Sequence, residues 1–97
     1  GTAPVQPVLH AAARRVADAP VCEIANTGTG HAQLADLVFV DRSGQRHPVA
    51  PGLAGYVLPG QMRSWALPVA DPAGGALVAR INGEAHERTL ALDVPAP

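Results

Sequence analysis

Residues that carry chemistry are scarce in this 97-residue chain. Its one cysteine, Cys22, excludes an internal disulfide. Phe39, Tyr56 and Trp65 are its three aromatic residues, and it has no lysine: all seven basic residues are arginine, which we interpret as codon bias of a GC-rich genome. No apolar run approaches the roughly 20 residues that cross a bilayer as a helix. No charged-then-apolar leader opens the sequence.

The charge balance excludes some partners. Seven arginines stand against eight acidic residues, so the formal net charge is −1. This balance lacks the basic footprint that nucleic acid or an anionic membrane requires. The length suits a single domain with a single hydrophobic core, which must be built mainly from Ala, Val and Leu because aromatics are so few.

The sequence is rich in turn formers. Ten prolines and ten glycines are spread along the chain, which indicates many turns. From Val21 onward, short alternating stretches are separated by turn residues at intervals of roughly 8–12 residues, the spacing of sandwiches and small barrels. The expected strands are residues 21–25, 31–40, 47–50, 53–58, 63–67, 77–81 and 89–94. We therefore predict an all-β, immunoglobulin-like antiparallel β-sandwich of about seven strands over residues 8–97, with residues 1–7 as a linker or tag remnant.

Two stretches depart from simple alternation. Residues 9–17 are the one segment where Ala and Arg would tolerate a helix. Leu34, Leu37 and Phe39 are core candidates, but the step from Leu34 to Leu37 is odd. If all three point inward, we expect a bulge or bend near Ala35-Asp36.

Several residues predict turns and edges. Pro48 makes its short strand unsuited to the centre of a sheet. Gly44 is available for a positive φ in a polar hairpin connection, and Pro59-Gly60 is a strong turn dipeptide. Asn82-Gly83 is the strongest hairpin signal, although the link to the next strand is longer than two residues.

No metal site or nucleophile emerges from the sequence. Blue copper needs Cys, His and Met ligands that converge, typically from one short loop, whereas Cys22, His31 and Met62 lie on three separate segments. No two Cys or His ligands stand at zinc-binding spacing. Ser43 and Ser64 are interpreted as a turn former and a solvent-facing strand residue, and the acids form no evident general acid and base pair.

The remaining polar candidates have mostly structural interpretations. Residues 26–30 contain two glycines but run toward a strand, so no helix N-terminus is available to hold phosphate. His10, His31, His47 and His86 are interpreted as surface or hydrogen-bonded structural residues. Tyr56 lies in an apolar strand beside a turn, where it either packs in the core or anchors a partner.

The order of the motifs has a family likeness. Asn26-Thr27-Gly28 is followed by His31-Ala32-Gln33-Leu34, by Gly52-Leu53-Ala54-Gly55-Tyr56-Val57-Leu58-Pro59-Gly60, and then by Arg63 and Trp65. This order resembles the C-terminal domain of the PapD-like periplasmic chaperones, in the branch that serves spore-coat-protein-U-like or archaic pili. The most telling piece is the Gly-Tyr-Val-Leu-Pro-Gly stretch, and the likeness runs over nearly the whole chain.

The resemblance implies an immunoglobulin-like domain that packs against an N-terminal sandwich to hold a pilin subunit. In that family a chaperone strand completes the subunit's sheet. The donor strand and the basic anchoring residues belong mainly to the N-terminal domain, so no residue here receives those roles. The implied partners are that N-terminal domain, pilin subunits and an outer-membrane usher in the periplasm, with no nucleic acid and no membrane insertion. Tyr56 and Arg63 are the candidate partner-binding residues, on a shared rim.

Other expectations accompany this hypothesis. Some members of the wider family have a disulfide in this domain, which a single cysteine cannot form. The alternative function is a free-standing immunoglobulin-like or fibronectin-like adhesion module, supported by strand count alone. An enzyme is the third hypothesis and the weakest, because no acid, base and nucleophile come together; we expect no catalytic residue, cofactor or metal. We also expect a bare sheet edge to pair with another copy.

Overall fold

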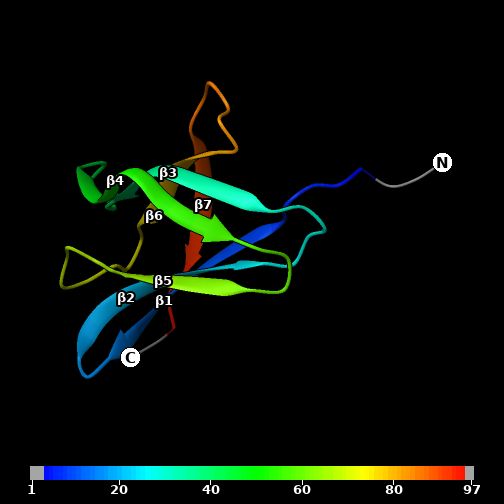
Figure 1. Ribbon diagram of the computed structural model, residues 1–97. Helices are drawn as coiled ribbons and strands as arrows, with labels where there is room; N and C mark the ends of the chain where they lie inside the picture. Colours follow the sequence, from blue (N-terminus) through cyan, green and yellow to red (C-terminus); the bar gives the residue numbers. More distant parts are fainter. Residues whose placement is uncertain (1–3, 96–97) are drawn as a thin grey trace.

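All regular structure in the computed structural model, which describes residues 4–95, is β-strand (Figure 1). This confirms the all-β prediction. These residues contain no helix that is long and apolar enough to cross a membrane. The seven strands are β1 (Leu9–Val16), β2 (Ala19–Asn26), β3 (Ala32–Val40), β4 (Arg46–Val57), β5 (Met62–Ala66), β6 (Ala76–Ile81) and β7 (Arg88–Asp93).

The strands form two layers. Their order is β4-β3-β6-β7-β1-β2-β5. All neighbours are antiparallel except β7 and β1, which join in parallel where Ala11 faces Leu92 and Ala12 faces Asp93. Figure 1 shows β1, β2 and β5 on one side and β3, β4 and β6 on the other, with edge strands β4 and β5 facing each other across the open side. The predicted sandwich is confirmed, with one parallel pair added.

The core lies between the layers and uses few large side chains. Cys22 and Ile24 share the inner face of β2, and both are fully buried. Burial raises the pKa of the Cys22 thiol to about 11, so the thiol stays protonated at neutral pH. The largest fully buried side chains are Phe39, Ile24, Leu34, Leu37, Leu77, Ile81, Val57, Asn26 and Cys22.

Residues 9–16 form strand β1, so the helical alternative for this segment is wrong. β1 pairs with β2 along eight residues and also touches β7. Ala11 and Ala13 alternate into the core. Ala17 and Asp18 have φ of 50° and 67°, the left-handed geometry of a tight two-residue hairpin. Pairing on both sides outweighs the helical propensity of Ala and Arg.

Strand β3 contains the predicted bulge. Leu34, Leu37 and Phe39 are all fully buried, and the pairing of β3 with β6 shifts register between Ala35 and Val38, where β3 has one residue more than β6. Asp36 takes a left-handed φ of 52°, and its Oδ1 accepts a hydrogen bond from the Gly52 N–H at 2.9 Å. The extra residue lets the odd step of three keep all three side chains on the core face.

The predicted strands 47–50 and 53–58 are one strand, β4. It stays paired with β3 from Arg46 to Val57, although the register shifts. Gly52 and Gly55, with φ of 68° and 145°, let the strand bend without breaking. β4 is an edge strand, as Pro48 predicted.

The predicted turns are confirmed. Gly44 has a φ of 87°. Gly60 has a φ of 79°, and the Gln61 N–H closes its turn on the Leu58 carbonyl at 2.9 Å. Asn82 and Gly83 both have positive φ, as a type I′ turn requires, and β7 begins only at Arg88.

Candidate partner-binding surface

The Asn26 side chain ties together three segments at one end of the sandwich. It is 1% exposed. Its Nδ2 donates to the carbonyls of Gly30 at 2.7 Å and Val57 at 3.0 Å. Its Oδ1 accepts from the N–H groups of Val8 at 3.2 Å and Gly28 at 2.9 Å. A buried amide with four partners costs little to bury and specifies one arrangement.

The main chain of Asn26 also positions the turn between β4 and β5. Its N–H donates to the Gln61 carbonyl at 3.0 Å, and its carbonyl accepts from the Gly60 N–H at 2.8 Å. The end of β4, the start of β5 and residues 26–30 are therefore held around one residue.

The segment before β1 lies along residues 26–30. The N–H groups of Thr29 and Gly30 donate to the Gln6 carbonyl at 2.9 and 3.0 Å, and the Thr27 N–H donates to the Val8 carbonyl at 2.8 Å. The Gln6 N–H in turn donates to Thr29 Oγ1 at 3.3 Å. With the bond from Val8 to the Asn26 amide, five hydrogen bonds fix this segment.

Close approach explains the two glycines of the turn. A Cβ on Gly28 would overlap the Gln6 carbonyl oxygen and lie 2.5 Å from the Val8 nitrogen. A Cβ on Gly30 would lie 3.0 Å from the Gln6 nitrogen. The sequence predicted only an ordinary turn. The two closely spaced glycines were a signal in the sequence, but their spacing does not reveal that the N-terminal segment packs against them.

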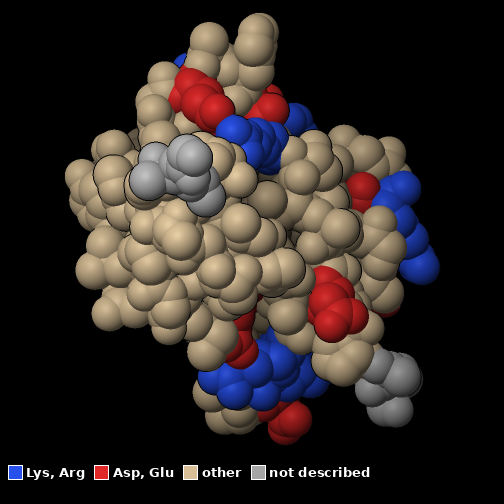
Figure 2. Space-filling view, turned by 90° about the vertical axis from the view of Figure 1, so that its right-hand side faces the viewer, with Lys and Arg blue, Asp and Glu red and all other residues tan. Residues whose placement is uncertain are grey.

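The segments that meet at Asn26 carry no charged residue. Residues 4–13, 24–35 and 48–62 lack Asp, Glu, Lys and Arg. Figure 2 shows a broad area without charged side chains at the end toward which the N-terminal segment runs, bordered by charged groups. We call residues 4–8, 26–30 and 57–62 the uncharged end. Its exposed large apolar side chains are Val5 (78%), Val8 (42%), Leu58 (46%) and Met62 (58%).

Tyr56 lies beside the uncharged end, on edge strand β4. Its side chain is 47% exposed, so the interpretation as a core residue is wrong. Its neighbours Gly55 and Val57 are buried, which places Tyr56 on the outer face of the layer. A half-exposed ring on an outer face remains available to a partner.

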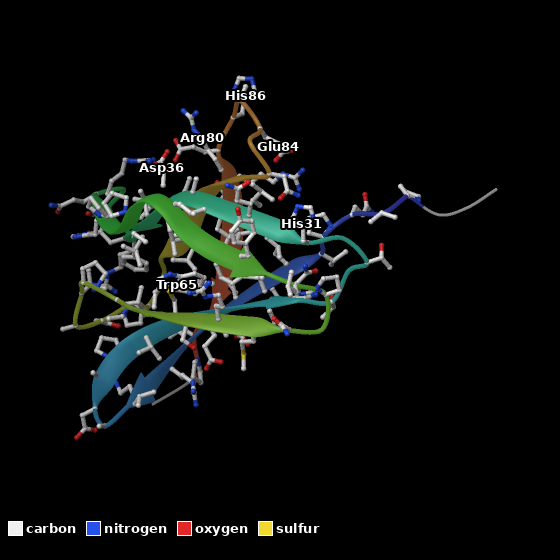
Figure 3. All side chains as sticks on the ribbon, in the orientation of Figure 1. His31, Asp36, Trp65, Arg80, Glu84 and His86 are labelled. Atoms are coloured by element: carbon white, nitrogen blue, oxygen red, sulfur yellow. The ribbon has the colours of Figure 1, made fainter. Side chains whose placement is uncertain are left out.

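Arg63 fills the gap between the two edge strands. Its guanidinium occupies the space over Gly55, where Nη1 would lie 2.5 Å from a Cβ, and Cζ is 5.9 Å from the centre of the Trp65 ring. Trp65 lies between β4 and β5 in Figure 3, and its Nε1–H donates to the Ala54 carbonyl at 3.4 Å. Arg63 thus packs over Gly55 while remaining exposed, and the exposed Tyr56 ring lies on the outer face of the same strand, so their joint role as partner-binding residues stays a prediction.

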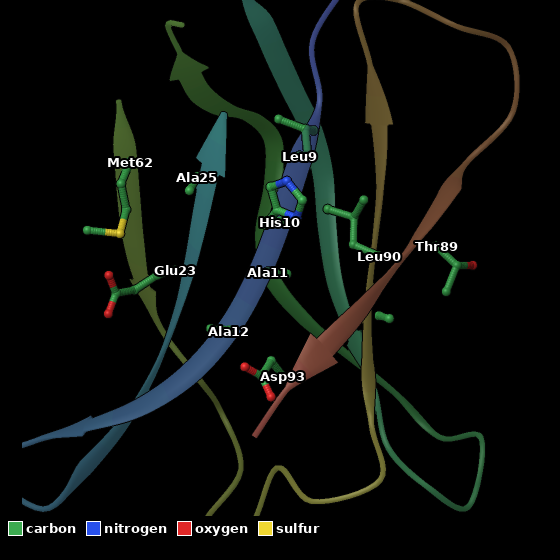
Figure 4. Close-up of a pocket in the computed structure, with 11 residues that line it drawn as sticks. Leu9, His10, Ala11, Ala12, Glu23, Ala25, Met62, Thr89, Leu90 and Asp93 are labelled. Atoms are coloured by element: carbon green, nitrogen blue, oxygen red, sulfur yellow. The ribbon is translucent and has the colours of Figure 1, made fainter. Parts of the chain in front are cut away.

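A shallow hollow lies on the outer side of β7, β1, β2 and β5, around Ala12 and Ala25 (Figure 4). Two of its polar side chains, Glu23 and His10, are engaged by neighbours, whereas Asp93 has no side-chain partner among residues 4–95. Glu23 is buried and forms an ion pair with Arg14. His10 Nε2 lies 3.0 Å from Thr27 Oγ1. The hollow therefore offers small side chains and one carboxylate, that of Asp93, beside a histidine that already contacts Thr27.

Asp41 organises the hairpin between β3 and β4. Its Oδ1 accepts from the Ser43 N–H at 2.9 Å, the Ser43 hydroxyl at 2.6 Å and the Gln45 N–H at 3.0 Å, and its Oδ2 lies 2.8 Å from His47 Nε2. Hydrogen bonds from His47 and Ser43 hold the Asp41 pKa well below its usual value.

This arrangement differs from a nucleophilic triad. The Ser43 hydroxyl donates to the carboxylate rather than to the histidine, so the imidazole is not placed to activate it. The geometry is that of an Asx turn, which agrees with Ser43 as a turn former. The Asp41 to His47 contact was missed, because the two residues meet only once the hairpin closes.

Two of the residues that were weighed and rejected as copper ligands lie in different environments. Cys22 is buried in the core, whereas Met62 is exposed on β5. Within residues 4–95, no three His, Cys, Asp or Glu side chains are grouped so that they could hold a metal ion.

No protein-family model, curated protein or solved structure matches this chain. The functional argument therefore starts from the uncharged end, the edge strands and the motif resemblance. Of these, the uncharged end is held together by the most hydrogen bonds.

Proposed function

We propose that this domain is the C-terminal accessory half of a periplasmic chaperone that binds pilin subunits and delivers them to an outer-membrane usher. The observation that carries the proposal is the seating of the N-terminal segment on residues 26–30 by five hydrogen bonds. A preceding domain joined through this segment would be held at the uncharged end in a restricted orientation.

The composition of that end supports a protein partner. Val5, Leu58 and Met62 expose large apolar side chains on a surface without charge. The centres of protein interfaces are depleted of charge, and covering apolar area contributes about 25 cal/mol per Å². Nucleic acid and anionic lipid would require basic residues here, and the three segments of this end have none.

The roles of the partners in this proposal are those that the family resemblance implies. The preceding domain is the neighbour at the uncharged end and contributes the strand that completes the pilin subunit. This domain supports it and forms one wall of the cleft, with Tyr56 on the outer face of β4 as the candidate contact to the subunit.

The proposal is tested on the full product of the encoding gene. We expect that product to carry a leader and an upstream sandwich of about 100–130 residues, and to retain a co-expressed pilin subunit that this chain alone does not retain. Leu58→Glu should weaken retention because it places a charge in the domain contact. Val16→Glu is the matched control, since Val16 is equally exposed (47%) but lies at the opposite hairpin.

Three results would contradict the proposal. The first is an open reading frame that starts at this domain. The second is equal subunit retention by the Leu58→Glu and wild-type proteins. The third is tight binding of a surface ligand by this chain alone, which would favour the adhesion module instead.

A further inference from the structure

The main chain of Tyr56 is free at the edge of β4. Tyr56 pairs with Gln33 of β3. The main chain of Gln33 is turned to the other side, because its N–H donates to Asn82 Oδ1 at 2.8 Å and its carbonyl accepts from the Asn82 N–H at 2.9 Å. Gln33 and Tyr56 are therefore a non-hydrogen-bonded pair. In such a pair of an antiparallel ladder, each residue directs its N–H and carbonyl away from the other residue. Tyr56 therefore directs both groups outward.

The neighbouring carbonyls on the same edge are already engaged. The Ala54 carbonyl accepts from the Trp65 indole at 3.4 Å, and the Leu58 carbonyl accepts from the Gln61 N–H at 2.9 Å. The free part of the edge is thus centred on Tyr56.

The usual protection of an edge strand is limited to the first half of β4. Pro48 and Pro51 lack an N–H, so they hinder the pairing of that half with an additional strand. Residues 53–58 contain no proline and no charge. They expose Leu53 (59%), Tyr56 (47%) and Leu58 (46%), so main chain and side chains together favour an added strand.

We propose that the occupant of this edge is a second copy of the chain, paired antiparallel to β4 about a two-fold axis at Tyr56. That register places each Tyr56 opposite the other, where they exchange both main-chain hydrogen bonds. Each Ala54 then lies opposite Leu58 of the other copy, so a small side chain meets a large one. Because the segment is uncharged, no like charges meet when it pairs with itself.

The contact is expected to be weak. The free edge is only a few residues long. The surface area buried in the dimer is therefore smaller than about 1,200 Å², the lower end for standard protein interfaces. Self-association should therefore appear at hundreds of micromolar and depend on concentration. The inference goes beyond the proposed chaperone role and holds whether or not a preceding domain exists.

Sedimentation equilibrium of the chain from about 10 µM to 1 mM tests the pairing, together with hydrogen exchange of the Tyr56 amide by NMR. The mass should rise from 9.9 kDa toward twice that value, and exchange of the Tyr56 amide should slow at least several-fold over the same range. Tyr56→Lys should abolish both effects, because two ammonium groups would then face each other. Met62→Lys adds the same charge on β5 and should leave both unchanged.

Each other outcome overturns the inference. A constant 9.9 kDa mass at 1 mM excludes the dimer. A rising mass with unchanged exchange of the Tyr56 amide places the contact elsewhere. Equal loss of association in Tyr56→Lys and Met62→Lys assigns it to the uncharged end. Circular dichroism of both variants confirms that they remain folded.

Discussion

Asn26 shows how one polar residue can decide the geometry of a whole end of the domain. Its side chain is buried among three segments distant in sequence, and each of its polar atoms has partners. Removing the amide would leave N–H and carbonyl groups of those segments buried without partners. The free-energy cost of such unsatisfied groups exceeds the net stabilisation that the hydrogen bonds contribute.

Asn26→Ala should therefore lower the free energy of unfolding by about 3 kcal/mol, measured by urea denaturation. Asn82→Ala is the matched control. The Asn82 amide also bonds two main-chain groups, to Gln33 and His31, but it is exposed, so water can replace it. We expect less than half the loss there. Equal losses in the two variants would contradict a special role for Asn26.

Asp41 should make stability depend on pH. Its pKa in the folded protein lies below the ordinary value of about 4, so the stabilisation it provides is present above that pH and is lost as the pH falls toward the folded pKa. In urea titrations, wild type should be more stable than Asp41→Asn at pH 7, and the difference should shrink between pH 4 and pH 2.

Asp71→Asn is the control for this titration, because the Asp71 carboxylate accepts one main-chain bond, from Ala73, and lacks a histidine partner. At pH 7 it should destabilise the protein less than Asp41→Asn does, because it alters fewer hydrogen bonds. A difference between wild type and Asp41→Asn that persists unchanged at pH 2 would contradict the assignment.

At the scale of the element, the edge strands β4 and β5 are joined by an arginine stacked between a glycine and the tryptophan. Gly55 has a φ of 145° and leaves room for the Arg63 guanidinium. Arg63 in turn lies against Trp65, the single tryptophan of the chain. This packing connects the two edge strands at Gly55.

Gly55→Ala should cost about 2 kcal/mol, from the strained φ and from displacement of the guanidinium. Gly44→Ala is the control for backbone strain alone, since Gly44 has a φ of 87° but open space around it. The fluorescence of Trp65 should shift to the red only in Gly55→Ala. Unchanged fluorescence in both variants would show that Arg63 and Trp65 are not coupled to Gly55.

The elements that could be predicted are those with local signals. The odd step from Leu34 to Leu37 located the bulge, and Pro59-Gly60 and Asn82-Gly83 located their turns. Strand β1 could not be predicted in this way, because its pairing with β2 and β7 is not a property of its own alanine-rich sequence.

The candidate site was less predictable than the fold. The exposure of Tyr56 depends on which face of β4 meets the core, and the bulge beside Gly55 sets that face. The partners of the Asn26 side chain come from positions up to 31 residues away, so a turn prediction for residues 26–30 could not identify them.

At the scale of the whole molecule, the account rests on an asymmetry between the two ends of the sandwich. The end with the β1–β2 hairpin carries Arg14, Arg15 and Asp18, whereas the uncharged end has none of these groups and exposes apolar side chains. A surface of that kind is expected to be covered by protein.

Hydrogen exchange by mass spectrometry, at low micromolar concentration, tests this claim most directly by comparing the chain alone with the full product of its gene. We predict slower exchange for peptides covering residues 4–8 and 57–62 in the longer protein, with no change for residues 15–20 at the opposite hairpin. Equal exchange at the uncharged end in both proteins would contradict the account.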